Sequence, residues 1–540
     1  MRKYCALIIW LCLAVSLVSA ASLGAVYQSD SVEALWIKRL CIETGITPPL
    51  PAAPWSGYEL YQSLMAIDRE ALSATGKTHF DILSRRLVGR FDPQYPVHAQ
   101  VELSPEIYVQ TNEDTTLTGR DWARGYADRQ GMLSVSAETL FGEHVYGLFD
   151  FEAKNTVNYE RLSEGETSFI GTFQTNDVLF SPDVQLENRA PFNAFAGYSD
   201  PHISLIAGRG VVSLGRGNTG NLLVGDHVDF HDFTRFSAAN NTVAYTFLTL
   251  SYDGIDNEGT AQALSFDENM RLFIAHHLAV NLGKRIRLSL AETALFYTSR
   301  LDLRMFSPLM FIHNYNNFDE TNNAMQAELE VALARGVSFH IQAMVDQIAL
   351  FGETLNATPN AWGVLGGLDF AIPLGKGLLT GWAEGVYTSP YLYLRGTDDW
   401  NLSLIGAHAM WSGAGIDYIG YQYGPDSIVA ALSLGYEEFE KYRICTRVLF
   451  GAHGENGRLG NVSSWQLDTG ETAFRLISPS GTPEYRLICS VEGGYTLGSS
   501  GWSASGCVDA VTAWNYQNIE DESFFDIQIS LGVTYAWHII

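Results

Sequence analysis

Apolar and polar side chains alternate along the last part of the chain, from residue 525 to residue 539. A period of two places every second side chain on the same face of a β-strand, so this segment is predicted to be a strand with one apolar face. At ~3.3 Å per residue the segment reaches ~50 Å, which crosses a bilayer even at a tilt of ~45°. The pattern therefore favours a strand that spans a membrane.

The same period of two begins near residue 97 and recurs through the rest of the chain. Strong alternation predicts strands at 131–141, 144–155, 242–252, 270–282, 285–298, 336–348, 441–453, 484–496 and 502–515. Weaker alternation predicts strands near 99–110, 166–174, 192–198, 202–212, 324–334, 362–371, 376–388, 401–411 and 426–437. Long polar loops are predicted at 112–130, 214–241, 299–323, 389–400 and 453–483. The expected fold class is all-β, a transmembrane antiparallel β-barrel of about 18 strands.

Helical spacing replaces the alternation between residues 21 and 95. Gly45 is expected to end a first helix, a capping box at residues 56–59 to open a second, and residues 78–81 to open a third. These signals predict a small N-terminal module of three helices over 21–95. We expect it to dock on the periplasmic mouth of a barrel formed by residues 96–540.

The first 20 residues have the composition of a signal peptide. Arg2 and Lys3 precede an apolar run that ends at Val18, and the small residues Ser19 and Ala20 follow. We therefore expect residues 1–20 to be removed on export. Beyond them the sequence has no apolar run near the ~20 residues that a membrane helix needs, so membrane insertion depends on the strands. The predicted location is the outer membrane of a diderm bacterium.

The acidic composition narrows the class of partner. The formal net charge is −27 at pH 7, from 60 acidic and 33 basic residues. Nucleic acid is excluded as the expected partner, because its phosphates are bound by Lys and Arg. An acidic surface or lumen suits neutral or cationic partners instead.

A glycine-rich stretch covers residues 208–226. Glycine at this density indicates backbone that adopts positive φ or is approached closely by another group. The Gly-x-Gly pattern does not predict a nucleotide site, because no βαβ unit surrounds it. Two interpretations stay open: a structural loop folded into the lumen, or a loop that binds a ligand.

An acidic and aromatic segment follows at residues 226–233 and a similar one, also rich in amides, lies at 311–323. The His and Asp side chains of residues 226–233 are possible ligands of a transition metal, although a solvated acidic loop is the simpler interpretation. A third interpretation is saccharide binding, because aromatic faces stack on sugars while carboxylates and amides bind hydroxyl groups. This hypothesis selects as candidate ligand-binding residues Gly217, Asn221, Asp226, Phe230, Asp232, Phe233, Asn316 and Asn317, with no metal ligand.

Catalytic motifs are missing from the sequence. It contains no Gly-x-Ser-x-Gly elbow and no His-Glu-x-x-His pair, and no isolated pair of carboxylates stands out among its acidic residues. We therefore expect a protein that is not an enzyme and has no cofactor. An outer-membrane hydrolase is kept as a distant alternative.

Several segments resemble one known family. Residues 33–46, followed by Pro51 and Pro54, resemble the N-terminal helix and Pro-Trp segment of Wzi-like capsule-assembly outer-membrane proteins. Residues 214–226 are similar to the glycine-rich segment of that family, with Arg216 in place of its usual Pro. Gly225 is a second departure, because Ser is usual there. Further positions similar to the family are Phe306 to His313, Asn322, Asn323, Gln342 and Asp346.

The resemblance implies an 18-stranded barrel with a periplasmic helical bundle. It implies a lectin that holds surface polysaccharide at the outer membrane for capsule attachment or assembly, with no catalysis. Outer-membrane lipid and the barrel-assembly machinery are the further partners expected. The alternative is a porin or solute transporter, in which inward-facing Arg287, Glu292, Gln342 and Asp346 line an aqueous path.

Overall fold

The computed structural model describes most of the chain. The described residues are 22–91, 96–112, 123–124, 129–153, 159–161, 167–169, 172–180, 192–228, 230–255, 261–262, 269–301, 306, 321–347, 360–394, 400–410, 413–455 and 477–539. The expected signal peptide, residues 1–20, lies outside them. None of the helices in these ranges is long and apolar enough to cross a membrane.

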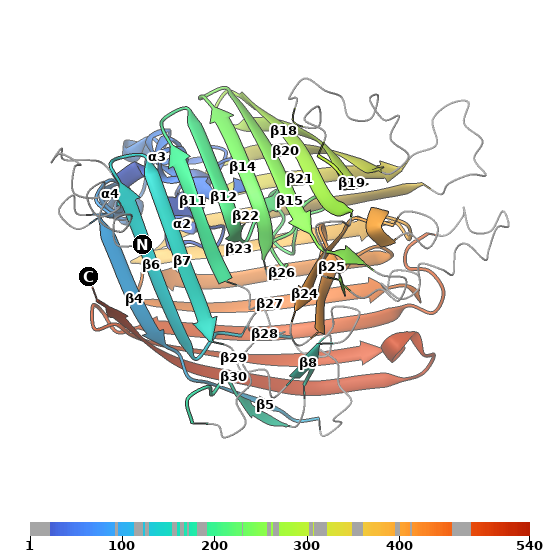
Figure 1. The fold of residues 1–540 in the computed structure, drawn as a ribbon. Coiled ribbons are helices and arrows are strands. Elements are labelled where there is room, and N and C mark those ends of the chain that lie inside the picture. The colour runs from blue at the N-terminus through green and yellow to red at the C-terminus, as the bar shows by residue number, and fades with distance from the viewer. Residues whose placement is uncertain are drawn as a thin grey trace, which may run out of the picture.

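Eighteen antiparallel strands close into a barrel within the described residues (Figure 1), as the alternation predicts. Strands β4 and β5 follow one another along the wall and together count as one of the eighteen, since both pair with β30, which closes the barrel. The wall strands are β4 (Val97–Leu103), β5 (Glu106–Gln110), β6 (Leu133–Phe141), β7 (Val145–Ala153), β11 (Phe192–Ser199), β12 (Ile203–Gly210), β14 (His231–Ala239), β15 (Val243–Tyr252), β18 (Met270–Leu282), β19 (Ile286–Thr298), β20 (Thr321–Ala334), β21 (Val337–Gln347), β22 (Ala361–Leu374), β23 (Gly377–Thr388), β26 (Ser427–Glu438), β27 (Tyr442–His453), β28 (Glu484–Thr496), β29 (Trp502–Trp514) and β30 (Ser523–His538).

Shorter elements accompany the wall. Strand β10 pairs with β5, and the other short strands form pairs of their own. They are β1 (Val26–Tyr27), β2 (Ala52–Ala53), β3 (Trp55–Ser56), β8 (Tyr159–Arg161), β9 (Thr167–Phe169), β10 (Phe173–Thr175), β13 (Ser213–Leu214), β16 (Gly254–Ile255), β17 (Ala261–Gln262), β24 (Ile405–Met410) and β25 (Gly413–Tyr418). The helices are η1 (Ser22–Gly24), α2 (Val32–Thr44), α3 (Gly57–Met65), η2 (Arg69–Ala71), α4 (Ala74–Val88), η5 (Trp400–Leu402) and η9 (Tyr516–Asn518).

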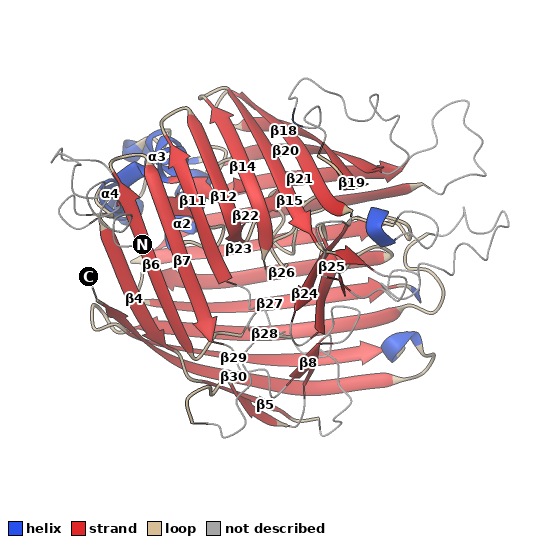
Figure 2. Ribbon diagram, viewed as in Figure 1, coloured by secondary structure: helices blue, strands red, loops and turns tan. Residues whose placement is uncertain are grey.

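The two ends of the barrel differ, and we call them the turn end and the loop end. At the turn end, short connections join pairs such as β11 and β12, β14 and β15, and β18 and β19. Helices α2, α3 and α4 lie at this end (Figure 2). The backbone N–H of Thr47 donates to the carbonyl oxygen of Lys284 at 2.9 Å, and the Thr75 hydroxyl donates to that of Gly375 at 3.1 Å. The helical module is therefore hydrogen-bonded to the turns of the barrel.

Local capping explains where the helices begin. Ser56 and Glu59 form the capping box predicted for α3, and Gly45 ends α2 with φ of 73°. The prediction that residues 78–81 open the third helix is wrong. Helix α4 begins earlier because Ser73 caps it, accepting a hydrogen bond from the backbone N–H of Gly76 at 2.9 Å.

One loop prediction and one strand prediction are also wrong. Residues 214–241 are not one loop, because their last part forms wall strand β14. Its inward positions His231, Arg235 and Ser237 are polar, and Asp232 on the outer face is polar too, so the expected alternation of apolar and polar residues is hidden. The predicted strand 401–411 is not part of the wall, since β24 pairs with β25 in a separate hairpin.

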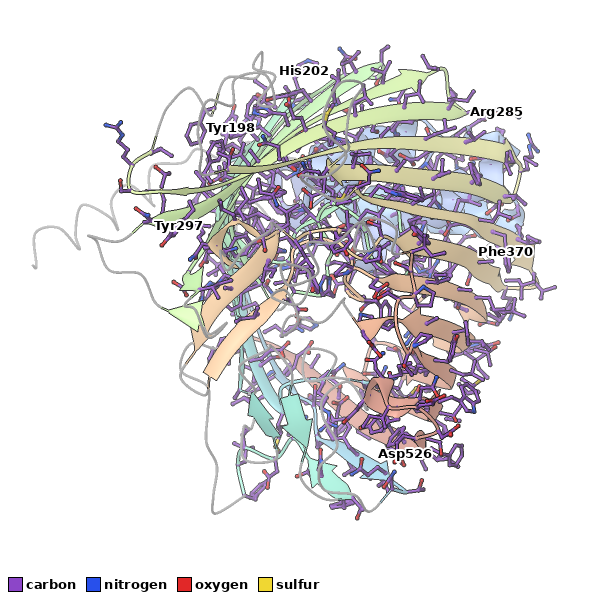
Figure 3. All side chains as sticks on the ribbon, turned by 90° about the vertical axis from the view of Figure 1, so that its right-hand side faces the viewer. Tyr198, His202, Arg285, Tyr297, Phe370 and Asp526 are labelled. Carbon is purple, nitrogen blue, oxygen red and sulfur yellow. The ribbon has the colours of Figure 1, made fainter. Side chains whose placement is uncertain are left out.

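The wall is apolar outside and polar inside. On β30 the outward residues Phe525 and Leu531 are exposed, whereas inward Asp526 and Gln528 are buried. Phe370 likewise lies on the outer side of the wall in Figure 3. Side chains exposed in this way are costly in water but favourable in hydrocarbon, which is the pattern of a barrel that crosses a membrane.

Candidate functional site

The chain after β12 leaves the wall and enters the barrel, and we call residues 211–228 the inner loop. Strand β13 of this loop pairs with β2 of the N-terminal segment. The backbone N–H of Gly215 donates to the carbonyl oxygen of Pro51 at 2.9 Å, and that of Leu214 donates to Val224 at 3.0 Å. The glycine-rich stretch is therefore held from the turn end by the segment between α2 and α3.

One wall carboxylate anchors the tip of the inner loop. Buried Glu384 on β23 accepts hydrogen bonds from the backbone N–H groups of Asn218 and Thr219, each at 2.8 Å, and from the Thr219 hydroxyl. His340 on β21 lies 3.0 Å from the same carboxylate through its Nε2. Hydrogen bonds to a buried charge are among the stronger ones in proteins, so the tip is firmly fixed.

A buried amide pair fixes the rest of the loop. Asn221 Oδ1 accepts from the backbone N–H of Gly217 at 2.8 Å and from Gln342 Nε2 at 2.9 Å. Gln342 Oε1 accepts from the backbone N–H of Leu222 at 3.1 Å. A Cβ atom on Gly217 would lie 1.7 Å from the carbonyl oxygen of Gly220, so the turn requires glycine. The predicted residues Gly217 and Asn221 thus shape the loop itself.

A buried charge network joins the loop to the wall. Arg216 Nε lies 2.8 Å from Glu330 on β20, and Arg287 on β19 lies 3.1 Å from the same carboxylate. All three side chains are at most 8% exposed. Because one carboxylate lies between two guanidinium groups, removing Glu330 would leave two buried positive charges without their counter-charge. Arg216 therefore acts as an anchor of the inner loop.

Tyrosines from residues 391–424 cover the inner loop on another side. The Tyr393 hydroxyl donates to the carbonyl oxygen of Leu222 at 2.7 Å and accepts from the backbone N–H of Tyr421 at 3.0 Å. Burial raises the pKa of Tyr393 well above its ordinary value, so the phenol keeps its proton and remains a donor. The segment also carries the hairpin of β24 and β25, whose residue Ile405 accepts a hydrogen bond from Arg271 of β18 at 2.6 Å.

On the opposite wall of the barrel, inward-facing side chains differ in exposure between the two ends. On β27 and β29, inward Arg443 and Ser505 are exposed near the turn end. Nearer the loop end, Asp526 is buried and accepts from the backbone N–H groups of Thr111 and Asn112, each at 2.9 Å. Within the residues that the structure describes, the inward surface of this part of the wall is therefore buried nearer the loop end and exposed nearer the turn end.

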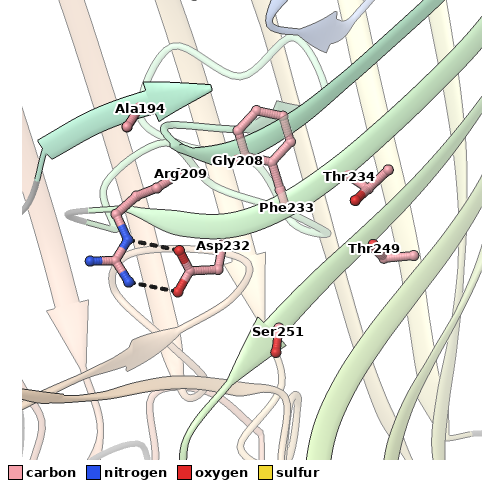
Figure 4. Close-up of a pocket in the computed structure, with 8 residues that line it drawn as sticks. All are labelled: Ala194, Gly208, Arg209, Asp232, Phe233, Thr234, Thr249 and Ser251. Carbon is pink, nitrogen blue, oxygen red and sulfur yellow. Dashed lines mark hydrogen bonds and ion pairs between the residues drawn. The ribbon is translucent and has the colours of Figure 1, made fainter. Parts of the chain in front are cut away.

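A recess of about 520 Å³ lies at the loop ends of β12, β14 and β15 (Figure 4). Arg209 and Asp232 form a two-pronged ion pair there, with Nε to Oδ1 at 2.7 Å and Nη2 to Oδ2 at 2.8 Å. The guanidinium also lies over the Phe230 ring, 4.0 Å from its centre. Residues that line the recess are Ala194, Gly208, Arg209, Asp232, Phe233, Thr234, Thr249 and Ser251.

The recess offers the groups that bind a polyhydroxylated ligand. The guanidinium donates, the carboxylate accepts, and the hydroxyl groups of Thr234, Thr249 and Ser251 do both. Asp232 is 41% exposed and Arg209 24% exposed, so the ion pair is accessible to a ligand. Within the described residues no group of three or more His, Cys, Asp or Glu side chains is placed to hold a metal ion.

The structure divides the predicted site residues into separate places. Asp232 and Phe233 line the recess, and buried Phe230 stacks beside it against Arg209 and against His408 at 4.2 Å. Asp226 is exposed on the inner loop, whereas Gly217 and Asn221 lie deeper in that loop. Asn316 and Asn317 lie outside the described residues.

Sequence reasoning missed the partner of Asp232. Arg209 comes from the preceding wall strand, and Thr249 and Ser251 from the following one. The sequence did contain a signal for these residues. Most outward positions of these strands, such as Leu205, are apolar, and a polar residue among them is unusual enough to indicate a site.

Comparisons with known proteins place the fold. No family model matches the chain, and no curated protein matches it. The fold matches the solved structure of Wzi, an outer membrane protein involved in group 1 capsule assembly in Escherichia coli and a carbohydrate-binding β-barrel. The TM-score is 0.59 at 13% identity, over 94% of this chain and 99% of that one. The resemblance seen in the sequence is thus confirmed as a likeness of fold.

Two other solved outer-membrane barrels match less well. OccK7 (OpdD) of Pseudomonas aeruginosa has a TM-score of 0.39 at 10% identity, over 82% of this chain and 99% of that one. OccAB1 of Acinetobacter baumannii has a TM-score of 0.41 at 8% identity, over 82% of this chain and 97% of that one.

Proposed function

We propose that this protein is a non-enzymatic outer-membrane β-barrel that binds exported surface polysaccharide and helps to retain or assemble it at the cell surface. The recess is the observation that carries the proposal. Its accessible Arg209 and Asp232 pair can donate to and accept from sugar hydroxyl groups, and the Phe230 ring backs the guanidinium. The Wzi structure, described as a carbohydrate-binding barrel of the same fold, supports this choice of ligand.

The proposed orientation puts the turn end in the periplasm and the loop end outside the cell. Outer-membrane barrels have short periplasmic turns and longer extracellular loops, and the helices bind the turn end. Residues 21–95 would then be a periplasmic module and residues 96–540 the barrel, with residues 1–20 removed on export. Membrane lipid and the barrel-assembly machinery are partners under the same proposal.

A passive pore fits the described interior less well than a binding protein does. The inner loop is anchored to Glu384, Gln342 and Glu330 on three different wall strands. An open porin needs a continuous aqueous path, and the inner loop occupies part of the lumen through which such a path would run. We therefore expect little ion conductance from the folded protein in a planar bilayer, and steady high conductance would favour the porin.

The test is binding of the detergent-folded full chain to surface polysaccharide purified from its own source. Asp232→Asn keeps the size of the side chain but removes its charge, and we expect it to weaken binding at least about tenfold, because a hydrogen bond to a charged group contributes ~1.5–3 kcal/mol. Asp81→Asn is the matched control, since Asp81 forms a similar two-pronged pair with Arg69 on the helical module. Equal binding by wild type and Asp232→Asn, with both proteins folded, would remove the recess as the site.

A further inference from the structure

We infer, on the basis of the proposed function, that the glycan bound in the recess is anchored in lipid. The recess would hold the sugar headgroup of an outer-leaflet glycolipid, while its acyl chains lie along the wall below. The inference concerns the same recess and adds the class of ligand. It follows from the direction in which the recess faces, its height on the wall and its polarity.

Strand register shows that the polar side chains of the recess face outward from the barrel. His231, Phe233 and Arg235 on β14 are buried, and Arg235 reaches Glu59 of α3 at 2.7 Å. Since neighbouring residues on a strand face opposite sides, Asp232 and Thr234 belong to the outer face. The ion pair and the hydroxyl groups thus lie on the membrane side of the wall, outside the lumen.

The outer face changes from polar to apolar in one step toward the turn end. Arg209, Asp232 and Ser251 are cross-strand neighbours in a first row, and Thr234 pairs with Thr249 in the next. The row after that consists of apolar residues on all three strands, namely Leu205, Phe236 and Phe247. A headgroup in the recess would therefore continue directly onto a surface suited to acyl chains.

The recess lies near the outer edge of a membrane. Strand β15 runs from Val243 at the turn end to Tyr252, and Ser251 is eight residues after Val243. Eight residues at ~3.3 Å, tilted by ~40°, rise ~20 Å, against an apolar band of ~25 Å. Charged groups on the outer face of a barrel are costly at the midplane of the membrane and much less costly near its interface with water. The ion pair is thus best placed at the headgroup level of the outer leaflet.

The size and chemistry of the recess fit a saccharide headgroup better than a bare acyl chain. Its volume of about 520 Å³ lies within the ~300–1,000 Å³ that small-molecule sites occupy. An acyl chain makes no use of the Arg209 and Asp232 pair, whereas sugar hydroxyl or phosphate groups bind to it directly. A glycolipid uses both the polar recess and the apolar rows beneath it.

The experiment compares three probes on the detergent-folded full chain: intact lipopolysaccharide, the same glycan after its lipid part is removed, and phosphatidylglycerol. We expect saturable binding of the intact glycolipid, at least about tenfold tighter than binding of the lipid-free glycan. Phosphatidylglycerol is expected not to compete. Asp232→Asn and Thr249→Leu should each weaken glycolipid binding at least about tenfold. Thr249→Leu is included because it fills the recess with an apolar group that suits the outer wall, so folding is retained.

The outcomes separate the inference from the proposed function. Equal affinity for intact and lipid-free glycan, lost in both variants, would overturn the lipid anchor and leave the polysaccharide function standing. No binding of either glycan by folded wild type would overturn both. Glycolipid binding that is unchanged in both variants, or that phosphatidylglycerol displaces, would overturn the assignment of the recess. The Asp81→Asn control on the helical module should bind like wild type throughout.

Discussion

Replacing Glu384 by alanine is expected to release the tip of the inner loop. The carboxylate accepts two backbone N–H groups and one hydroxyl from the loop. Each hydrogen bond to a charged group contributes ~1.5–3 kcal/mol. The sum of three such bonds overstates the free energy of anchoring, because water forms hydrogen bonds with the released groups when the loop opens. The cost of removing one member of a buried charged network, ~3–5 kcal/mol, is the better guide. At ~1.4 kcal/mol per factor of ten, the ratio of closed to open loop falls by a factor between ~10² and ~4 × 10³.

Single-channel recording in planar bilayers measures this opening. Wild type should show little conductance, and Glu384→Ala should show frequent openings under the same voltage. Glu492→Ala is the matched control, because Glu492 is also an inward-facing wall carboxylate but pairs with Arg443, away from the loop. A Glu384→Ala protein that is folded and as quiet as wild type would refute the role of the inner loop as a closure. Equally high conductance in all three proteins would point instead to an open pore.

Three further changes have outcomes that follow from single contacts. Burial against Trp36 and Phe439 lowers the pKa of His79 to about 4, so the unfolded state binds more protons between pH 6.5 and 4. Stability should therefore fall by up to about 3 kcal/mol as the pH drops through that window, and a His79→Phe variant should lose this part of the dependence of Tm on pH. Gly217→Ala should lower Tm by several degrees, since its Cβ meets the Gly220 carbonyl oxygen, and an unchanged Tm would contradict the observed turn. Arg235→Met leaves Glu59 of α3 without its partner at a cost of ~3–5 kcal/mol, so limited proteolysis should release the helical module faster, and wild-type resistance would show that the pair does not hold it.

The alternation of apolar and polar residues along the sequence determined which segments form strands of the barrel wall. Strands such as β18 and β28 have the bounds that their alternation predicts, because each lipid-facing residue must be apolar and each inward one tolerates polarity. Strand β14 was not predicted, because its residues do not alternate between apolar and polar. Its inward residues contact the module and its first outward residue joins an ion pair, so both faces are polar. A local pattern does not show which polar residue has a partner across the sheet.

The candidate site was only half visible in the sequence. The acidic and aromatic segment contains Asp232, whose carboxylate lines the recess, and Phe233, which also borders the recess but is buried on the inward face of β14. The ion pair with Arg209 depends on the register of β12 against β14, which the tertiary structure sets. The same holds for Asn221, whose partner Gln342 is 121 residues away.

Local signals thus determined which elements form, since alternation and helix caps act over a few residues. Only the tertiary structure decided that the glycine-rich loop turns into the barrel and that Asp232 faces outward. Both depend on contacts between distant segments, such as Glu384 with Thr219, whose free energy exists only after the barrel has closed. A one-residue change of register would exchange the two faces of β14, so the location of the recess is a property of the whole sheet.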